Sequence, residues 1–333
     1  MSELRMAVIG LGYIGSLHTR IIAENANAKL VAVADLNKEL AEKMAGEYGC
    51  EAYGDYNEML KRDDIDAVAV CVPEDFHVEP AVAVANAKKH LFIEKPIAKT
   101  VAEAEQIKKA CEDNGVRLMV GHVLKMDPRY VQLNDAVKRG DLGEISQIFV
   151  KRQNPKSVAA RFRGRVSFFY YLGVHDIEWM LSYAYGLKPV KVYAQMNHVV
   201  NGKVDDFDTA YVIVNFDNGA LGCICLGWSL PDNDAVGILS QVELIGSKGM
   251  GIIDTRNSGL EVITDNKAQF PDTLLWPVYN DRLQGDLKEE MDHFIQATLK
   301  DAPYLIDTDN AIASVRIVEA AFQSIETGMP VEL

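Results

Sequence analysis

The sequence predicts an α/β protein with two domains: an N-terminal doubly wound parallel sheet and a C-terminal α+β domain with a large, mainly antiparallel sheet. Two observations lead to this prediction. Over residues 1–122, apolar segments alternate with segments of helical periodicity, the pattern of a parallel sheet covered by helices on both faces. Over residues 123–333, apolar segments follow one another with short turns between them, as antiparallel strands do. A chain of 333 residues is long enough for both domains.

The N-terminal strand runs directly into a glycine-rich turn. Residues 6–9 are apolar, and Gly10, Gly12 and Gly15 follow them as Gly-x-Gly-x-x-Gly, with a helical pattern after the turn. Gly10 supplies the positive φ of a tight turn, Gly12 leaves room for a pyrophosphate, and Gly15 lets the helix pack against the strand. The helix N-terminus then offers N–H groups to phosphates. The cofactor-binding residues expected here are Gly10, Gly12, Tyr13, Ile14 and Gly15.

A second apolar strand, residues 30–34, ends in Asp35, twenty residues after Gly15. An acid at this place accepts hydrogen bonds from the adenosine ribose hydroxyls, so the whole pattern predicts a dinucleotide-binding Rossmann domain over residues 1–122. Asp35 also opposes a 2′-phosphate, and no arginine follows it directly. We therefore expect NAD in preference to NADP, with Lys38 close enough to soften the preference.

The remaining elements of the first domain place further residues at the same edge of the sheet. Strands are expected near residues 51–53, 67–72, 90–93 and 117–120, and helices near 37–48, 56–61, 76–87 and 101–112. Ligands of such sheets bind beyond the carboxyl ends of the strands. The residues expected along that rim are Val72, Pro73, His77, Glu94, Lys95, Pro96, Gly121 and His122.

The second domain begins with a helix over about 127–139, because Asp127-Pro128 is a helix-start signal. Strands are expected at 145–152, 190–197, 209–216, 221–228, 241–245, 251–254 and 260–264. Asp217-Asn218-Gly219 predicts a hairpin between two of them. Two helices, about 285–299 and 308–327, close the chain.

Two residues are candidates for moving a proton. Lys95, at the rim, would lie beside a nicotinamide and stabilise a developing alkoxide or relay its proton; the alternative is a solvated lysine. His175 opens a helix, with Tyr171 four residues earlier on the same face, and an imidazole suits proton transfer from an alcohol; the alternative is a capping or core histidine. His77 and His122 are at most neighbours of cofactor or substrate.

The other histidines, His18, His90, His198 and His293, have no comparable setting. We expect no metal site, because no HExxH motif occurs and the cysteines lack ligand spacing.

The composition narrows the classes of partner and location. The net charge is −14, which disfavours non-specific binding to nucleic acid or anionic membranes. We find no signal peptide and no apolar run long enough to span a bilayer, so we expect no membrane partner. The five cysteines form no Cys-x-x-Cys pair, and their odd number argues against a disulfide framework. We therefore expect a cytoplasmic protein.

Taken together, these features resemble the glucose-fructose oxidoreductase / inositol dehydrogenase / rhizopine-catabolism (Gfo/Idh/MocA) family of NAD(P)-dependent sugar and cyclitol dehydrogenases. The resemblance runs essentially end to end. It is carried by Gly10–Gly15, Asp35, Val72-Pro73 with His77, Glu94-Lys95-Pro96, Asp127-Pro128 with Tyr130, Leu172–Asp176 and Asn218-Gly219-Ala220.

The resemblance implies hydride transfer between a secondary hydroxyl of a sugar, sugar nucleotide or cyclitol and the nicotinamide. In that family the residues matching Lys95 and His175 act at the reacting carbon, and homodimers or homotetramers form through the sheets. Two alternatives exist on the same scaffold, an NAD-dependent glycosidase and a non-catalytic cofactor-binding regulator. The presence of both Lys95 and His175 argues against the regulator.

The chain departs from the family pattern just before His175. Family members commonly carry an aspartate where Tyr171 stands, and the usual glycine pair upstream is replaced by residues 166–169. Tyr171 is therefore a third catalytic candidate, which contributes a phenol hydroxyl or shapes the pocket.

A basic segment raises the question of the substrate's charge. Residues 145–175 contain no Asp or Glu, and three alternating arginines would share one side of an extended segment. Arginine forks suit phosphate or carboxylate, so an anionic substrate is expected, with a neutral sugar or inositol as the alternative. Surface or subunit-interface ion pairs are the other explanation of the arginines. The expected substrate-binding residues are His122, Arg161, Arg163, Arg165 and Asp176.

Overall fold

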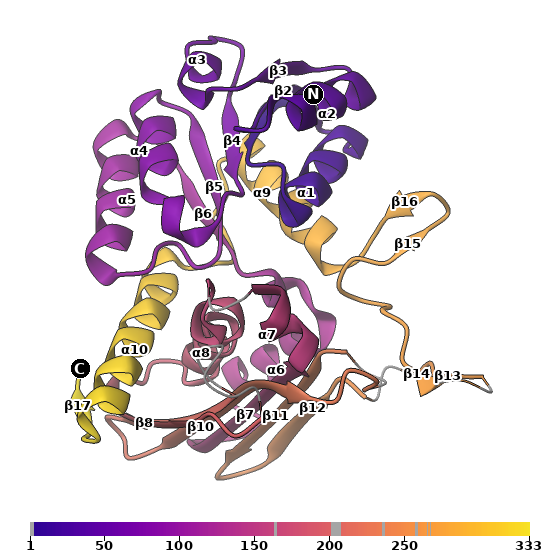
Figure 1. Ribbon diagram of the computed structural model, residues 1–333. Helices are drawn as coiled ribbons and strands as arrows, with labels where there is room; N and C mark the ends of the chain where they lie inside the picture. The colour runs from indigo at the N-terminus through magenta and orange to yellow at the C-terminus, as the bar shows by residue number, and fades with distance from the viewer. Residues whose placement is uncertain are drawn as a thin grey trace. The chain divides into compact units, whose positions relative to one another are not determined.

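The computed structural model describes residues 3–162, 165–200, 208–234, 237–256, 259–264, 266 and 268–333 (Figure 1). The chain forms two compact units: Met1–Asp127 with Leu274–Ile312, and Pro128–Thr273 with Ala313–Leu333. The expected boundary at residue 122 therefore does not coincide with these units, because a late segment returns to the first one. Helix α9 (Asp286–Leu299) buries Phe294 there, with its ring 5.6 Å from that of Phe92.

The first unit contains the expected parallel sheet of six strands, in the order β3-β2-β1-β4-β5-β6. Every neighbouring pair is parallel. The strands are β1 (Leu4–Ile9), β2 (Ala28–Ala34), β3 (Glu51–Tyr53), β4 (Ala67–Val70), β5 (His90–Glu94) and β6 (Leu118–Gly121). The strand order reverses between β1 and β4, and dinucleotides bind outside the carboxyl ends of the strands at such a point.

Helices cover both faces of this sheet. Figure 1 shows α4 and α5 on one face and α1, α2 and α9 on the other. The ends follow local capping chemistry: the Asn37 side chain accepts from Leu40 N–H, and Thr100 forms a capping box with Glu103. The bounds are α1 (Tyr13–Glu24), α2 (Lys38–Tyr48), α3 (Tyr56–Leu60), η1 (Glu74–Phe76), α4 (Val78–Asn86), α5 (Val101–Asn114) and η2 (Val123–Met126).

The second unit is built on a seven-stranded sheet in the order β12-β11-β7-β10-β9-β8-β17. It is antiparallel except for the β7–β10 pair, so the prediction of a mainly antiparallel sheet is confirmed. The predicted hairpin joins β9 to β10, with Gly219 at a φ of +88°. The strands are β7 (Ile145–Pro155), β8 (Pro189–Asn197), β9 (Thr209–Phe216), β10 (Leu221–Leu230), β11 (Leu239–Gly246), β12 (Met250–Asp254) and β17 (Val331–Glu332).

One predicted strand does not join this sheet. The segment 260–264 contributes only β13 (Val262–Ile263), which pairs with β14 (Ala268–Gln269) in a separate ribbon. A second ribbon, β15 (Val278–Tyr279) with β16 (Arg282–Leu283), belongs to the first unit.

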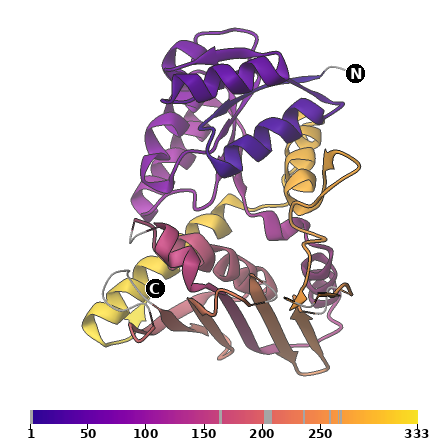
Figure 2. The same ribbon diagram turned by 45° about the vertical axis from the view of Figure 1, so that its right-hand side comes forward.

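Helices cover one face of the seven-stranded sheet and leave the other open, as Figure 2 shows from a second direction. Val150, Val212 and Ile224 point to the covered face and are buried. Tyr211 and Ile213 alternate with them and are exposed. The helices of this unit are α6 (Pro128–Lys138), α7 (Lys156–Phe162), the π-helical turn η3 (Phe169–Gly173), α8 (Val174–Tyr183) and most of α10 (Thr308–Thr327). Among the described residues, no helix combines the length and apolar character that crossing a membrane requires.

Candidate active site

The glycine turn after β1 has the shape that a dinucleotide needs. Gly10 has a φ of +89°, and a Cβ there would lie 2.8 Å from the backbone of Cys71 and Val72. A Cβ on Gly15 would lie 1.9 Å from the Gly10 carbonyl oxygen. A Cβ on Gly12 would meet no atom within 4 Å. Packing therefore requires two of the glycines, whereas Gly12 faces open space at the α1 N-terminus, where a pyrophosphate fits.

The Asp35 carboxylate joins this turn to the next helix. Its Oδ2 accepts from the Leu11 N–H at 2.7 Å, and its Oδ1 accepts from the Asn37 N–H at 2.8 Å. Each carboxylate oxygen keeps acceptor capacity beyond these bonds. Asp35 is thus oriented at the end of β2 and can still accept from the two hydroxyls of a ribose.

His77 holds two rim loops together. Its Nε2 lies 2.9 Å from the Val72 carbonyl oxygen and its Nδ1 lies 2.8 Å from that of Pro96. The side chain is buried, and burial lowers the pKa of His77, against the raising effect of its hydrogen bonds to the two carbonyls. Since both nitrogens face backbone carbonyls, His77 shapes the loops after β4 and β5 and would act on a cofactor through Val72 and Pro73.

Glu94 anchors the backbone of Lys95 to the sheet. Glu94 Oε1 lies 2.7 Å from Nε2 of His18, and Oε2 accepts from the Lys95 N–H at 3.1 Å. Burial by itself would raise the pKa of Glu94, but the hydrogen bond and charge of His18 and the charge of Lys95 bring it below its ordinary value. His18, which the sequence does not single out, is carried by α1 to the end of β5.

The rim also carries a second buried histidine. His122 follows β6 and is buried. Burial, with the charges of Lys125 and Lys95, lowers the pKa of His122 to about 3. His122 is therefore a neutral group within electrostatic reach of Lys95, and a substrate contact by it remains a prediction.

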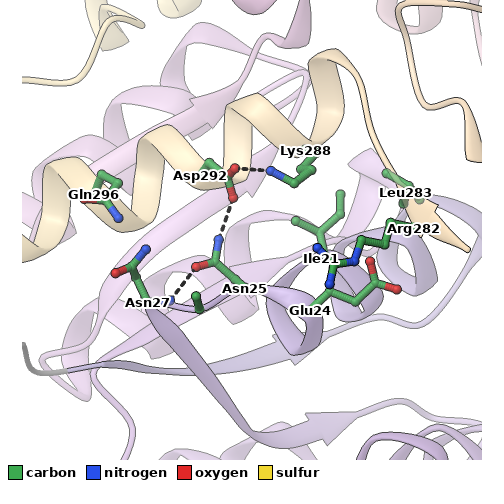
Figure 3. A pocket seen from close by; sticks show the side chains of 10 residues that line it. Ile21, Glu24, Asn25, Asn27, Arg282, Leu283, Lys288, Asp292 and Gln296 are labelled. Carbon is green, nitrogen blue, oxygen red and sulfur yellow. Dashed lines mark hydrogen bonds and ion pairs between the residues drawn. The ribbon is translucent and has the colours of Figure 1, made fainter. Parts of the chain in front are cut away.

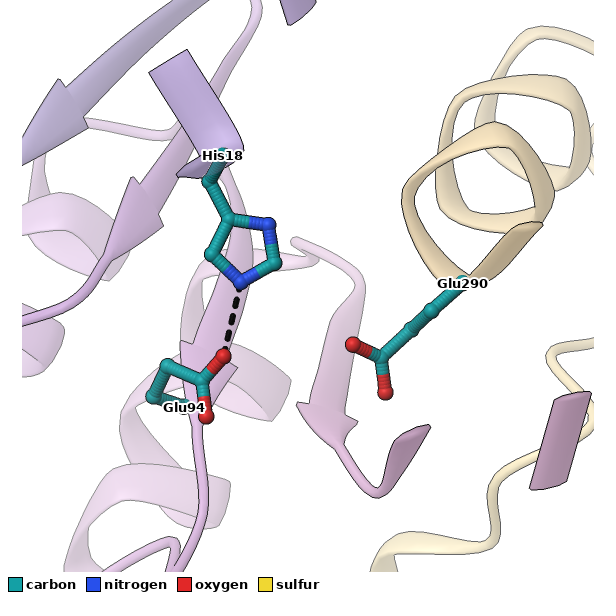
Figure 4. A group of neighbouring side chains, drawn as sticks. All are labelled: His18, Glu94 and Glu290. Atoms are coloured by element: carbon teal, nitrogen blue, oxygen red, sulfur yellow. Dashed lines mark hydrogen bonds and ion pairs between the residues drawn. The ribbon is translucent and has the colours of Figure 1, made fainter. Parts of the chain in front are cut away.

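One cluster in the described residues resembles a set of metal ligands. Atoms of His18, Glu94 and Glu290 lie within 4.8 Å of one another (Figure 4). The 2.7 Å separation between His18 and Glu94 is a direct hydrogen bond, and the charge of Lys95 nearby opposes a cation. We interpret the cluster as three ionisable side chains that share protons, and not as a metal site. Sequence reasoning missed Glu290, because nothing near it in the chain marks it as part of a site.

In the second unit, an irregular helix start positions His175. The turn η3 is π-helical, and the Val174 N–H donates to the Phe169 carbonyl five residues back. Single π-turns inside helices are frequent at functional sites. Tyr171 lies in this turn, and His175 lies in the first turn of α8. A Cβ on Gly173 would lie 2.7 Å from Leu226, so the close packing on β10 explains the glycine.

Asp176, beside His175, is committed to an ion pair. Arg152 of β7 donates to both of its carboxylate oxygens at 2.8 to 3.0 Å, and both side chains are buried. Burial by itself would lower the pKa of Arg152, but the charge of Asp176 raises it instead, so the guanidinium stays charged. The pair fixes the start of α8 on the sheet, and a substrate contact by Asp176 stays a prediction.

Arg161 does not lie on an extended segment, the arrangement that would align the three arginines. Arg161 lies in the last turn of α7, and this helix forms where an extended chain is expected because Asp232 Oδ1 accepts from the Ser157 N–H and caps its first turn. Arg161 Nη2 lies 3.3 Å from the Tyr171 hydroxyl. Arg165 Nε donates to the Phe162 carbonyl. Arg163 lies outside the described residues.

Tyr171 belongs to an aromatic cluster. Its ring centroid lies 4.8 Å from that of Phe162 and 6.3 Å from that of Trp228. The hydroxyl reaches Arg161 at the edge of this cluster. The structure therefore brings together two of the predicted site residues, Arg161 and Tyr171.

A pocket of about 280 Å³ in the first unit lies elsewhere (Figure 3). It is lined at one side by Ile21, Glu24 and Asn25, at the carboxyl end of α1, and Asn25 donates to Asp292 of α9. Gly12 caps the other end of α1. This pocket is therefore remote from the dinucleotide turn.

Comparison with known proteins agrees with the geometry. The family described as "Oxidoreductase family, NAD-binding Rossmann fold" matches residues 4–122, and "GFO/IDH/MocA C-terminal domain" matches residues 130–251. Myo-inositol 2-dehydrogenase of Thermotoga maritima is 28% identical over 99% of this chain and 98% of its own. Inositol 2-dehydrogenase of Rhizobium meliloti is 28% identical over 97% of each. The structure of myo-inositol 2-dehydrogenase from Lactobacillus plantarum, 22% identical, has the same fold over 100% of both chains, with a TM-score of 0.86.

Proposed function

Because the chain belongs to the Gfo/Idh/MocA family of NAD-binding oxidoreductases, we propose that it oxidises a ring hydroxyl of a neutral cyclitol with NAD. It is an NAD-dependent dehydrogenase acting on CH–OH groups. The observation that carries the proposal is the open space at Gly12 beside the oriented carboxylate of Asp35. The name of the substrate class comes from the relatives, and inositols are uncharged cyclitols.

The residues of the first unit fit the cofactor. The glycine turn and the α1 N-terminus would bind the pyrophosphate, and Asp35 would bind the adenosine ribose. Val72 and Pro73 follow β4, and Glu94 ends β5 with Lys95 directly after it, at the edge where the nicotinamide half would bind. When bound, NAD supplies the hydride acceptor.

Lys95, His175 and Tyr171 are the residues that we assign to the proton. Lys95 would hold the substrate oxygen through its ammonium and stabilise the alkoxide as the C–H bond breaks. His175 would take the hydroxyl proton, a role that suits an imidazole side chain. Tyr171 would shape the pocket wall with its aromatic neighbours and add one polar hydroxyl.

A neutral substrate is favoured over the anionic one for a structural reason. The anionic expectation depends on three arginines along an extended segment, and α7 removes that arrangement at Arg161. The Arg161 guanidinium instead donates a hydrogen bond to the Tyr171 hydroxyl and lies over the ring of Phe162. A phosphorylated or carboxylated sugar remains the second candidate, because Arg161 is exposed beside Tyr171.

A spectrophotometric screen tests the proposal. The purified protein is incubated with NAD or NADP and a panel of inositol isomers, neutral sugars, acidic sugars and UDP-sugars, and absorbance at ~340 nm follows reduction of the nicotinamide. We expect the highest kcat/KM with an inositol and NAD. Activity confined to charged sugars would overturn the proposed cyclitol substrate in favour of an anionic sugar. Hydrolysis of a glycoside without net absorbance change would indicate the glycosidase.

Assembly and location are part of the proposal. The open face of the seven-stranded sheet exposes Tyr211, Ile213 and Leu221, and an exposed apolar patch is typical of an interface. We propose a homodimer or homotetramer through this face. All five cysteines are free thiols, which fits the reducing cytoplasm.

A further inference from the structure

Three ionisable side chains meet inside the first unit, away from the surface (Figure 4). His18 comes from α1, Glu94 from the end of β5 and Glu290 from α9. His18 and Glu290 are fully buried, and the Glu94 side chain is 14% exposed. One donor or acceptor atom of each lies within 4.8 Å of the others.

The two carboxyl groups differ in what surrounds them. Glu94 has a partner at each oxygen, His18 Nε2 and the Lys95 N–H, so its negative charge is stabilised. Neither oxygen of Glu290 meets a hydrogen-bond partner among the described residues. Two buried carboxylates at this separation repel each other, and a bare buried carboxylate is strongly disfavoured. The two carboxyl groups therefore hold one proton between them. Binding that proton at Glu290 costs less free energy than binding it at Glu94.

The surroundings support the same division. Burial raises the pKa of Glu290 well above its ordinary value, and the charges of Glu94 and Asp286 raise it further, against a smaller lowering by Lys95. The elements packed around Glu290 contribute these titratable groups: Glu94 and Lys95 beside β5, His18 on α1, Cys71 after β4, Asp286 on α9, and His122 and Lys125 at η2.

We infer that Glu290 is a positioning residue for Lys95: it stays protonated, and so leaves Glu94 as the single negative charge of the cluster, which acts on the lysine. Figure 4 shows the Glu290 carboxyl group directed toward Glu94 and His18. The role for Lys95 rests on the proposed function, whereas the protonation of Glu290 does not. A divalent cation is the competing occupant of the cluster.

The first test measures stability and requires no turnover. A carboxyl group whose pKa is raised on folding takes stability away as pH climbs above its unfolded pKa, about 4.3. Replacing it by a neutral amide removes that loss. The Tm of Glu290→Gln should therefore match that of the wild type below about pH 4 and exceed it increasingly toward pH 8. Glu289→Gln, at an exposed neighbouring site on α9, is the control and should run parallel to the wild type.

The outcomes separate the possibilities. A Tm of Glu290→Gln that falls below that of the wild type as pH rises means an ionised, stabilised Glu290 and overturns the inference. A pH-independent difference overturns it as well. If Mn²⁺ or Zn²⁺ raises the Tm of the wild type but not of Glu290→Gln, the cluster is a cation site and the inference fails.

The second test follows Lys95 itself. Its pKa is measured from the pH dependence of labelling by an amine-selective ester, read by mass spectrometry. Glu290→Gln is polar and uncharged, like the protonated acid, and should leave the Lys95 pKa unchanged. Glu290→Met removes the polar group near Glu94, which disfavours the Glu94 charge, and Glu94→Gln removes that charge, so both should lower the Lys95 pKa.

Activity adds a separate readout. In Glu290→Met we expect kcat to fall about tenfold with an unchanged KM, and Glu290→Gln to restore it. If both Glu290 variants leave the Lys95 titration unchanged, Glu290 is only structural and the positioning role is overturned. If the labelling results hold but no polyol is oxidised, the proposed function fails and the cluster chemistry stands.

Discussion

Arg152 holds the carboxylate of Asp176 through both Nε and Nη2, at 2.8 to 3.0 Å, and the Asp176 side chain is fully buried while that of Arg152 is 8% exposed. The pair joins β7 to the turn of α8 that carries His175. It thus links a catalytic candidate to the middle of the second sheet.

Removing one partner of this pair should destabilise the protein severely. Arg152→Ala leaves an uncompensated carboxylate in the interior, which costs about 3–5 kcal/mol in the free energy of unfolding. Lys151→Ala, on the open face of the same strand, should change it little. Urea unfolding followed by circular dichroism measures both. Equal stability of the two variants would show that Asp176 is neutral or otherwise compensated.

Loss of Lys95 or His175 should remove chemistry and keep cofactor binding. We expect Lys95→Ala to lower kcat at least about 10²-fold, a typical contribution of a positioned acid–base group, and His175→Ala to act similarly. Lys99→Ala and His198→Ala serve as matched controls, since both side chains reach the surface. Isothermal titration with NAD checks that binding survives. Turnover at the wild-type rate in either test variant would remove that residue from the mechanism.

Asp35 should set the choice between the two nicotinamide cofactors. A hydrogen bond to a charged group contributes about 1.5–3 kcal/mol, so Asp35→Ser should lower the ratio of kcat/KM for NAD over NADP at least about tenfold. Lys38→Ala should raise that ratio. Higher kcat/KM with NADP than with NAD in the wild type would contradict the assignment of Asp35. Thermal unfolding is the necessary companion measurement, because Asp35 also bonds the Leu11 and Asn37 backbone.

The open sheet face should mediate self-association. Light scattering at micromolar concentration should give two or four times the chain mass of 36.9 kDa. Ile213→Asp places a charge in the middle of the exposed apolar face and should shift the mass toward one chain. Ile263→Asp is the control, because Ile263 is exposed on a ribbon outside the sheet. A single-chain mass for the wild type would refute the assembly.

Local signals were sufficient for the first sheet and the dinucleotide turn. The glycines act within the turn itself, and alternation of apolar and helical segments needs no distant partner. Helix α7 was beyond such reasoning, because seven residues carry a weak periodic signal and Asp232, which caps them, lies 75 positions away. The same limit explains His18 and Glu290: their meeting depends on α9 packing against α1, which no spacing in the sequence records.

The return of residues 274–312 to the first unit has a consequence for biosynthesis. A ribosome releases the sheet of that unit long before Phe294 is available to cover Phe92. At ~5–20 residues per second, the nascent sheet waits roughly 10–40 s after Asp127 for its last helix. During that interval the apolar surface that α9 covers stays exposed, and we expect a ribosome-associated chaperone to bind there. Crosslinking of stalled nascent chains ending before and after Ile312 would detect the difference.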